Sequence, residues 1–286
     1  MGQCLNMANS VAGTVPSLTE KQGLIDLSMG DCFASGAAVG YARAGRPVVF
    51  VTRYQGFQWF NAPFFTNYAA KCKELWNYDC PIFIRSVGMD GSGGFGQSIG
   101  PVASCSHHGM FIRTPGMKVF APMTPGEWLK GWNHWREYGG PIYSSEYRRS
   151  YSLTNEMPDI LNRHPQLTLF PISVTRLNVL EALPILESEG IVCNVINIVW
   201  LKPFEVEQRM ISSLEISSRG GIVLDSDFEN AASKCAAYDI MQHTNKKIRV
   251  LGLEERTAGF ASHLDNLPPT PERICEYVRK IVNPAL

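Results

Sequence analysis

Short apolar runs alternate with amphipathic segments along most of this chain, and this rhythm constrains the fold more than any other feature. Runs such as VVFV and IFI have the length of buried strands, and the segments between them have helical apolar spacing. A parallel sheet flanked by helices produces this order, because each strand is followed by a helical crossover. In the first half we expect strands at 47–52, 81–87, 118–123 and 141–146, and helices at 57–76 and 125–137.

Residues 153–166 break the rhythm with two prolines and many polar residues, which is typical of a linker. A second alternation follows, with strands expected at 167–173, 192–201, 221–226 and 248–253 and helices at 175–189, 204–216 and 229–242. The sequence therefore predicts an α/β protein of two domains, residues 1–152 and 167–286. Each is a mostly parallel sheet flanked by helices.

Two of the expected helices have clear start signals. Thr124 stands at a capping position, with Pro125 in the first helical position and Glu127 in the third. Thr270, followed by Pro and Glu, begins the last helix in the same way. The first of these helices carries a stripe formed by Trp128, Trp132 and Trp135. We interpret this stripe as core or subunit interface rather than as a cofactor site.

The composition excludes several classes of partner. Lys plus Arg and Asp plus Glu both number 26, so no long-range field favours nucleic acid or an anionic membrane. The eight cysteines are scattered without a CxxC pair, which argues against a zinc site and a disulfide framework. There is no signal-peptide pattern and no apolar run of roughly 18 residues. We expect a cytoplasmic, soluble protein with reduced thiols and no bound metal of its own.

Two short motifs invite functional interpretations. GSGGFG at 91–96 matches G-x-G-x-x-G and follows a strand, as in nucleotide-dependent oxidoreductases. No helix signal opens at its third glycine, and Gly116 to Lys118 occupy the position of the ribose-binding acid, so we favour a plain glycine loop. His107 and His108 are adjacent and point in different directions on any regular element, which disfavours a shared metal. Their role, structural or functional, stays open on spacing alone.

The order of several segments resembles the thiamine-diphosphate pyrimidine-binding domain of 2-oxo acid dehydrogenase E1 β subunits and split transketolases. The resemblance runs through DCFASGAAVG at 31–40, AGRP at 44–47, Phe57 and NYAAK at 67–71. It continues through SHH at 106–108 and PGMKV at 115–119. EGIVCNVIN at 189–197 and LKP at 201–203 resemble the transketolase C-terminal domain.

The resemblance implies site residues in the first domain. Asp31 falls where the family has a glutamate that hydrogen-bonds the cofactor's aminopyrimidine ring and promotes its activation. Asp reaches about 1.5 Å less than Glu. The resemblance implies that Asp31 keeps the function of the family's acid. The alternative is that Asp31 only begins a helix and has no chemical function. Phe57 corresponds to the aromatic residue that packs on the ring, and it also suits the core.

The resemblance also places a histidine in the site. His107 or His108 corresponds to the active-site histidine, with His107 preferred, for proton transfer or stabilisation of an oxyanion. Tyr54, Gln55 and Arg53 follow the strand end where ligands gather in α/β sheets. Tyr54 is implied as a cofactor contact. Arg53 either binds a carboxylate or phosphate group of the substrate, or is a solvated side chain.

Half of such a cofactor site is missing from this sequence. The family holds the diphosphate and Mg²⁺ with a GDG…N motif in a separate domain, and GMDG at 88–91 has no matching Asn. The resemblance therefore implies an α-type partner chain, an α2β2 heterotetramer and a small-molecule substrate. The implied reaction is C–C bond cleavage or formation next to a carbonyl, by 2-oxo acid decarboxylation with acyl transfer or by ketol transfer. The alternative is a non-catalytic scaffold subunit with a degenerate cofactor site.

Overall fold

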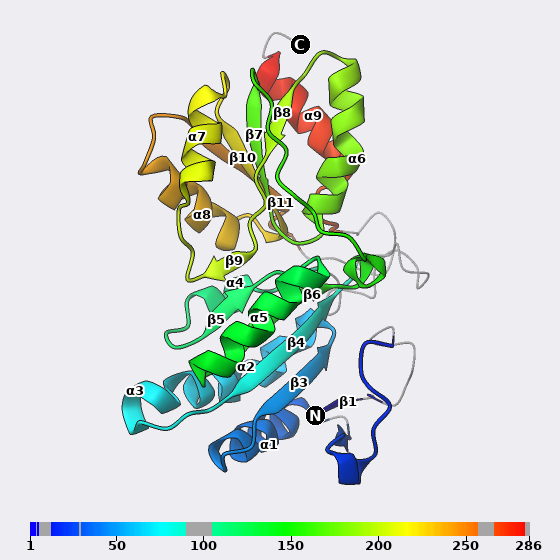
Figure 1. The fold of residues 1–286 in the computed structure, drawn as a ribbon, viewed down its shortest axis with the longest axis vertical. Helices are drawn as coiled ribbons and strands as arrows, with labels where there is room; N and C mark the ends of the chain where they lie inside the picture. The colour runs from blue at the N-terminus through cyan, green and yellow to red at the C-terminus, as the bar shows by residue number, and fades with distance from the viewer. Residues whose placement is uncertain (4, 6–12, 29, 90–104, 257–265, 284–286) are drawn as a thin grey trace. The chain divides into compact units, whose positions relative to one another are not determined.

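The computed structural model describes residues 1–3, 5, 13–28, 30–89, 105–256 and 266–283, and in it the chain divides into two compact units (Figure 1). The first unit is Met1–Glu156, and the second comprises Met157–Arg256 and residues 266–283. The division falls inside the segment predicted as a linker. The glycine motif at 91–96 lies outside the described residues. No helix in the described part of the chain is long and apolar enough to cross a membrane.

The first unit is built on a parallel sheet, as the alternation predicts. Its strands lie in the order β2-β1-β3-β4-β6-β5, and each neighbouring pair is parallel. The strand bounds are Gly2–Gln3 for β1, Asp26–Leu27 for β2, Val48–Arg53 for β3, Ile82–Gly88 for β4, Lys118–Phe120 for β5 and Ile142–Tyr147 for β6. The carboxyl ends of β3, β4 and β6 therefore meet at one edge of the sheet.

Helices cover the two faces of this sheet. Phe65 of α2 (Gln58–Asn67) packs edge-on against Phe50 of β3, and α1 (Asp31–Arg43) packs beside α2. Phe83 of β4 is in register with Val49, so it points to the opposite face from Phe50. There α5 (Pro125–Tyr138) surrounds Phe83 with Trp128, Trp132 and Trp135. Trp135 of the tryptophan stripe is therefore part of the core, whereas Trp132 is partly exposed beside it.

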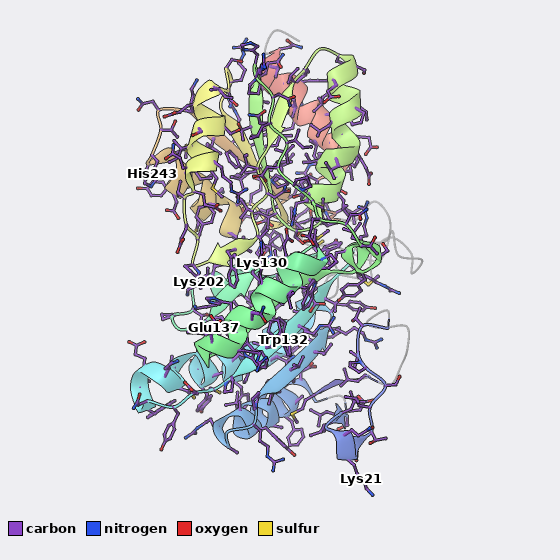
Figure 2. All side chains as sticks on the ribbon, viewed as in Figure 1. Lys21, Lys130, Trp132, Glu137, Lys202 and His243 are labelled. Atoms are coloured by element: carbon purple, nitrogen blue, oxygen red, sulfur yellow. The ribbon has the colours of Figure 1, made fainter. Side chains whose placement is uncertain are left out.

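The other side of α5 is polar. Lys130 and Glu137 are exposed on it, and both are labelled in Figure 2.

The hydrogen bonds at the start of α5 differ from the predicted capping by Thr124 and Glu127. Glu156 accepts hydrogen bonds from the Gly126 N–H at 2.7 Å and from the Thr124 hydroxyl at 2.6 Å. Glu127 accepts from the Met123 N–H, outside the helix. A carboxylate 30 residues away supplies this cap, which no local pattern could reveal.

The prediction of one helix over 57–76 is wrong. The chain forms a short 3₁₀ turn at Gln55–Phe57, then α2, a second 3₁₀ turn at Ala69–Lys71, and α3 (Cys72–Trp76). The turn at Gly116 meets this segment directly, because a Cβ on Gly116 would lie 1.9 Å from the Ala70 carbonyl oxygen. This contact with a distant turn accompanies the break between α2 and α3. A four-residue helix, α4 (Gly109–Ile112), precedes β5.

The second unit has a parallel sheet in the order β11-β10-β7-β8. Its elements are β7 (Leu167–Pro171), α6 (Thr175–Ser188), β8 (Cys193–Val195), β9 (Trp200–Lys202), α7 (Gln208–Ile216), β10 (Gly221–Phe228), α8 (Ala232–Met241), β11 (Ile248–Leu253) and α9 (Pro271–Val282). The predicted strand 192–201 is wrong, because β8 and β9 are two short strands. Thr270 caps α9 as predicted, by accepting the Arg273 N–H at 3.3 Å. The α/β class is confirmed in both units.

We predict that Gly116→Ala destabilises the protein more than Gly45→Ala. Both glycines have positive φ, +74° and +77°, so both alanine variants carry backbone strain of roughly 1–2 kcal/mol. Gly45 has open space around its Cβ position, whereas Gly116 faces the Ala70 carbonyl. Urea unfolding of both variants measures the difference. Equal losses in the two variants would show that the contact between Gly116 and Ala70 contributes nothing to stability.

Candidate functional site

The residues that leave β3 build one end of the sheet edge. Gln55 and Phe57 lie in the 3₁₀ turn after β3, and Gln58, Trp59 and Asn61 lie in the first turns of α2. Gln55, Gln58 and Asn61 are buried, Phe57 is half-buried and Trp59 is exposed. Buried side-chain amides are uncommon unless they have hydrogen-bond partners, so their partners define the local structure.

The Gln55 side chain joins three segments. Its Nε2 donates to Ser145 Oγ and to the Glu146 carbonyl oxygen, both at 3.0 Å. Its Oε1 accepts from the His107 backbone N–H at 2.8 Å and from the Tyr143 hydroxyl at 3.0 Å. Both hydrogens and both lone pairs of the amide are then used. Gln55 thereby anchors the histidine segment to the end of β6.

The two histidines occupy different environments. His108 is fully buried, and its Nδ1 lies 3.0 Å from Ser145 Oγ. His107 is half-buried, and its Nδ1 accepts a hydrogen bond from Trp59 Nε1 at 3.3 Å. The Trp59 and His107 rings meet edge-on, with centroids 6.3 Å apart and an angle of 84° between their planes. His107 is therefore the more exposed of the two side chains, although its Nε2 atom is buried.

Asn61 links the predicted acid to the backbone of the turn that carries the predicted aromatic residue. Asp31 is the first residue of α1 and is half-buried. Asn61 Nδ2 donates to Asp31 Oδ1 at 3.2 Å and to the Phe57 carbonyl oxygen at 3.1 Å. Asn61 Oδ1 is buried without a hydrogen-bond partner among the described residues, and so is Gln58 Oε1. An unsatisfied buried acceptor costs about 1–3 kcal/mol, so these two atoms suit a ligand that carries N–H groups.

Tyr54 and Arg53 have contacts of a different kind. Tyr54 packs against a small apolar cluster formed by Leu5, Val51 and Val87. The Arg53 guanidinium lies over the Tyr54 ring, 5.9 Å from its centroid. These contacts account for both side chains as packing elements, and their roles toward a cofactor or substrate stay predictions.

Asn61 and Ser145 were not identified from the sequence. Asn61 is a polar residue inside the aromatic stretch WFNAPFF, and its burial is a signal that this pattern could have given. Ser145 lies near the end of β6, where parallel strands present ligand-binding side chains. Asp31 lies 30 residues from Asn61 and Gln55 lies 90 residues from Ser145, so only the fold identifies these two contacts.

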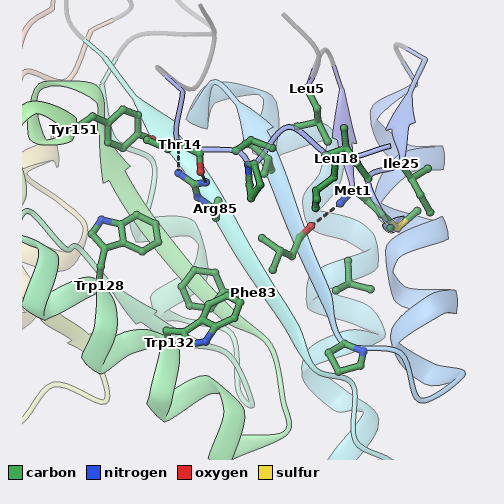
Figure 3. A pocket seen from close by; sticks show the side chains of 18 of the residues that line it. Met1, Leu5, Thr14, Leu18, Ile25, Phe83, Arg85, Trp128, Trp132 and Tyr151 are labelled. Atoms are coloured by element: carbon green, nitrogen blue, oxygen red, sulfur yellow. Dashed lines mark hydrogen bonds between the residues drawn. The ribbon is translucent and has the colours of Figure 1, made fainter. Parts of the chain in front are cut away.

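A cavity among the described residues lies on the opposite face of the sheet (Figure 3). It has a volume of about 1020 Å³, and its walls include Phe83, Trp128, Trp132 and Tyr151. None of the six predicted site residues lines it. Arg85 also lines it, from the same face of β4 as Phe83, whereas Ser86 points the other way and accepts a hydrogen bond from Gln58.

A buried ion pair stands beside this cavity. Arg85 Nε and Nη2 each lie 2.9 Å from an oxygen of Glu146, which is fully buried, and Arg85 also donates to Thr14. Burial would lower the pKa of Arg85, but the Glu146 carboxylate outweighs it and raises that pKa above its usual value. Burial and Glu146 raise the pKa of Tyr151 well above its ordinary value, so Tyr151 stays neutral and donates to Glu146. The pair is a structural element of the sheet.

We predict that Glu146→Leu is strongly destabilising, by about 3–5 kcal/mol, because it leaves the Arg85 charge buried without its partner. The double variant Arg85→Met with Glu146→Leu removes both charges and should recover much of this loss. Chemical denaturation of the single and double variants measures the coupling. A double variant as unstable as the sum of both single variants would contradict a direct pairing.

Comparisons with known proteins add a family context. No protein-family model matches the chain. It is 26% identical over 197 residues to the pyruvate dehydrogenase E1 component subunit beta of Mesostigma viride, covering 64% of this chain and 59% of that protein. The subunit of the same name from Rickettsia felis is 24% identical over 278 residues, covering 90% and 83%. The chain spans less than two thirds of the Mesostigma relative and 43% of the one from Porphyra purpurea.

Solved structures agree on the fold. A split-gene transketolase, described as an inactive beta4 tetramer, superposes with a TM-score of 0.65 at 15% identity, covering 92% of this chain and 85% of that one. Transketolase from Campylobacter jejuni superposes with a TM-score of 0.67 at 16% identity, covering 97% of this chain and 43% of that one. The predicted resemblance to E1 β subunits and split transketolases is confirmed by these matches.

Proposed function

We propose that this chain is the β-type subunit of a two-chain, thiamine-diphosphate-dependent enzyme and contributes the aminopyrimidine half of the cofactor site. The observation that carries the proposal is the pair of hydrogen bonds from Asn61, which link the Asp31 carboxylate to the backbone carbonyl of Phe57 in the turn after β3. The names of the E1 β relatives support the same cofactor class. A carboxylate and an aromatic ring are the two groups that the resemblance assigns to an aminopyrimidine ring.

The donor and acceptor set fits this group. An aminopyrimidine presents ring nitrogens and an exocyclic amine, and Asp31 and the buried acceptor Asn61 Oδ1 offer complementary partners. Phe57 is half-buried and offers a ring face. When bound, the cofactor supplies the carbanion stabilisation that reactions next to a carbonyl need. The chain's own residues would orient the ring: Asp31 in its protonated form would donate to a ring nitrogen, and Asn61 fixes the direction of the Asp31 carboxyl group.

The short side chain of Asp31 affects where the cofactor ring can bind. Asp lacks one methylene of Glu, about 1.5 Å of reach, and a misplacement near 1 Å costs on the order of 100-fold in rate. Asn61 holds the Asp31 carboxylate in one orientation from a separate helix, which limits the loss from misalignment. We infer that the acid role is retained in Asp31 and that the cofactor ring lies correspondingly close to the start of α1.

The proposed substrate is a small molecule with a reactive carbonyl. The relatives named as pyruvate dehydrogenase subunits favour a 2-oxo acid over a sugar ketol donor. His107 is the proposed residue facing the reacting carbonyl, because His108 is buried against Ser145. Arg53 is the proposed contact for a substrate carboxylate.

The partner is proposed to be an α-type chain that holds the diphosphate and Mg²⁺, in an α2β2 assembly. Large aromatic side chains are exposed on α1, on α2 and directly after α2, and the two helices also carry Asp31 and Asn61. They are Phe33 at 68%, Trp59 at 61%, Phe60 at 51% and Tyr68 at 46% exposure. Exposed aromatic clusters of this kind are typical of subunit interfaces. This surface supports a cofactor site shared between two chains.

We predict that co-expression with candidate partner chains, in the presence of thiamine diphosphate and Mg²⁺, yields a heterotetramer carrying two cofactors. Native mass spectrometry gives the stoichiometry and the cofactor count in one spectrum. The chain alone, treated in the same way, is the control and should carry none. A heterotetramer without cofactor would favour the scaffold alternative, and a lone homodimer would remove the basis of the enzyme proposal.

We predict that Asp31→Ala lowers turnover by the assembled complex on the order of 10²- to 10⁴-fold, which is the usual contribution of a positioned acid. Asp79→Ala is the matched control, because Asp79 is exposed and pairs only with Lys73 at the surface in the described contacts. Steady-state kinetics and calorimetric titration of thiamine diphosphate measure both variants. Undiminished turnover in Asp31→Ala would show that Asp31 activates nothing.

A further inference from the structure

The hydrogen bond between Trp59 and His107 determines where His107 carries its proton. The indole N–H of Trp59 is a donor without any acceptor capacity. Its partner, His107 Nδ1, lies 3.3 Å away and must accept with a lone pair. A neutral imidazole has one proton, so that proton then lies on Nε2. The edge-on ring geometry, with an interplanar angle of 84°, directs the indole edge at this nitrogen.

We propose that Trp59 is a positioning residue that fixes His107 in the Nε2–H tautomer, so that His107 presents an N–H donor to the reacting carbonyl. The inference deepens the function proposed above and rests on it for its catalytic meaning. The tautomer itself depends only on contacts within this chain. Histidine ligands in proteins are oriented in the same way by the hydrogen bond at their second nitrogen.

Two anchors hold the His107 ring in place. Its backbone N–H donates to Gln55 Oε1 at 2.8 Å, which fixes the main chain, and Trp59 fixes the ring at Nδ1. Gln55 is fully buried, whereas Trp59 is 61% exposed. The Trp59 side chain can therefore be changed with little effect on the core of this chain.

The tautomer restricts the chemistry open to His107. With Nδ1 engaged as an acceptor, the neutral ring offers only the Nε2–H, which is a donor suited to negative charge that develops on a carbonyl oxygen. Loss of that proton would produce an imidazolate, and a general-base role would need the other tautomer and would break the bond to Trp59. His107 therefore stabilises the oxygen by hydrogen bonding, without net proton transfer.

The test is histidine side-chain NMR on the full-length chain, labelled with ¹⁵N, at a pH above the range in which histidines titrate. The ¹⁵N shifts of Nδ1 and Nε2 report the tautomer of each neutral ring. We expect His107 to be mainly Nε2–H in the wild type. In Trp59→Phe the ratio of the two tautomers should move toward Nδ1–H by roughly 2- to 10-fold, the equivalent of a hydrogen bond of about 0.5–1.4 kcal/mol.

Trp76→Phe is the matched control, because Trp76 is also largely exposed and packs beside Arg43 in α1 instead. It should leave the His107 shifts unchanged, and the His108 shifts should stay constant in both variants. A wild-type His107 in the Nδ1–H form, or a tautomer ratio unaltered by Trp59→Phe, would overturn the proposal.

Kinetics of the assembled complex distinguish this inference from the proposed function. Trp59→Phe should lower kcat while the affinity for thiamine diphosphate is unchanged, because Trp59 acts through His107. A complex with no cofactor-dependent activity in the wild type would remove the proposed function, while the NMR result would still decide the tautomer. Equal kcat values for wild type and Trp59→Phe, despite a shifted tautomer, would overturn the donor role assigned to His107.

Discussion

Gln55 places an uncharged side-chain amide at the sheet edge where the strands end, and the position of the histidine segment depends on the hydrogen bonds of this one group. The amide extends from the end of β3 across β4 to Ser145 and Glu146 of β6. The absence of a side chain at Gly88 makes this crossing possible, because a Cβ there would lie 3.1 Å from Gln55 Nε2. Since the amide is buried, loss of any one partner would leave an unsatisfied polar group.

Two neighbouring residues of β6, Ser145 and Glu146, have hydrogen-bond partners on both faces of the sheet. Glu146 gives its carbonyl oxygen to Gln55 and its carboxylate to Arg85, beside the cavity of the other face. Ser145, its neighbour, points back toward His108. This division follows from the alternation of side chains along a strand. The ion pair between Arg85 and Glu146 therefore supports the backbone on which the histidine segment rests, although its charges face away from the site.

The elements that the sequence predicts well are those fixed by local patterns, and the failures occur where distant contacts decide. Apolar runs located β3, β4 and β6, and the Thr270 cap needed only three neighbouring residues. The break after Asn67 coincides with a contact from Gly116, and the cap of α5 comes from Glu156. In the candidate site, the family resemblance led to Asp31, Phe57 and His107. Asn61 has a local signal for burial, but its contact with Asp31 reaches another helix and no local pattern reveals it.

The geometry of Asp31 bears on the choice between an acid for the cofactor and a simple helix start. A carboxylate at the first position of α1 is favourable to the helix dipole by about 0.3–1 kcal/mol wherever it points. That benefit needs no partner from another helix. Asn61 nevertheless commits both hydrogens of a buried amide to Asp31 and Phe57, and keeps its own Oδ1 buried without a partner among the described residues. An unsatisfied acceptor is costly, so helix stability alone would favour an apolar residue at this position. The arrangement makes physical sense when a ligand with N–H groups completes it, which favours the acid role.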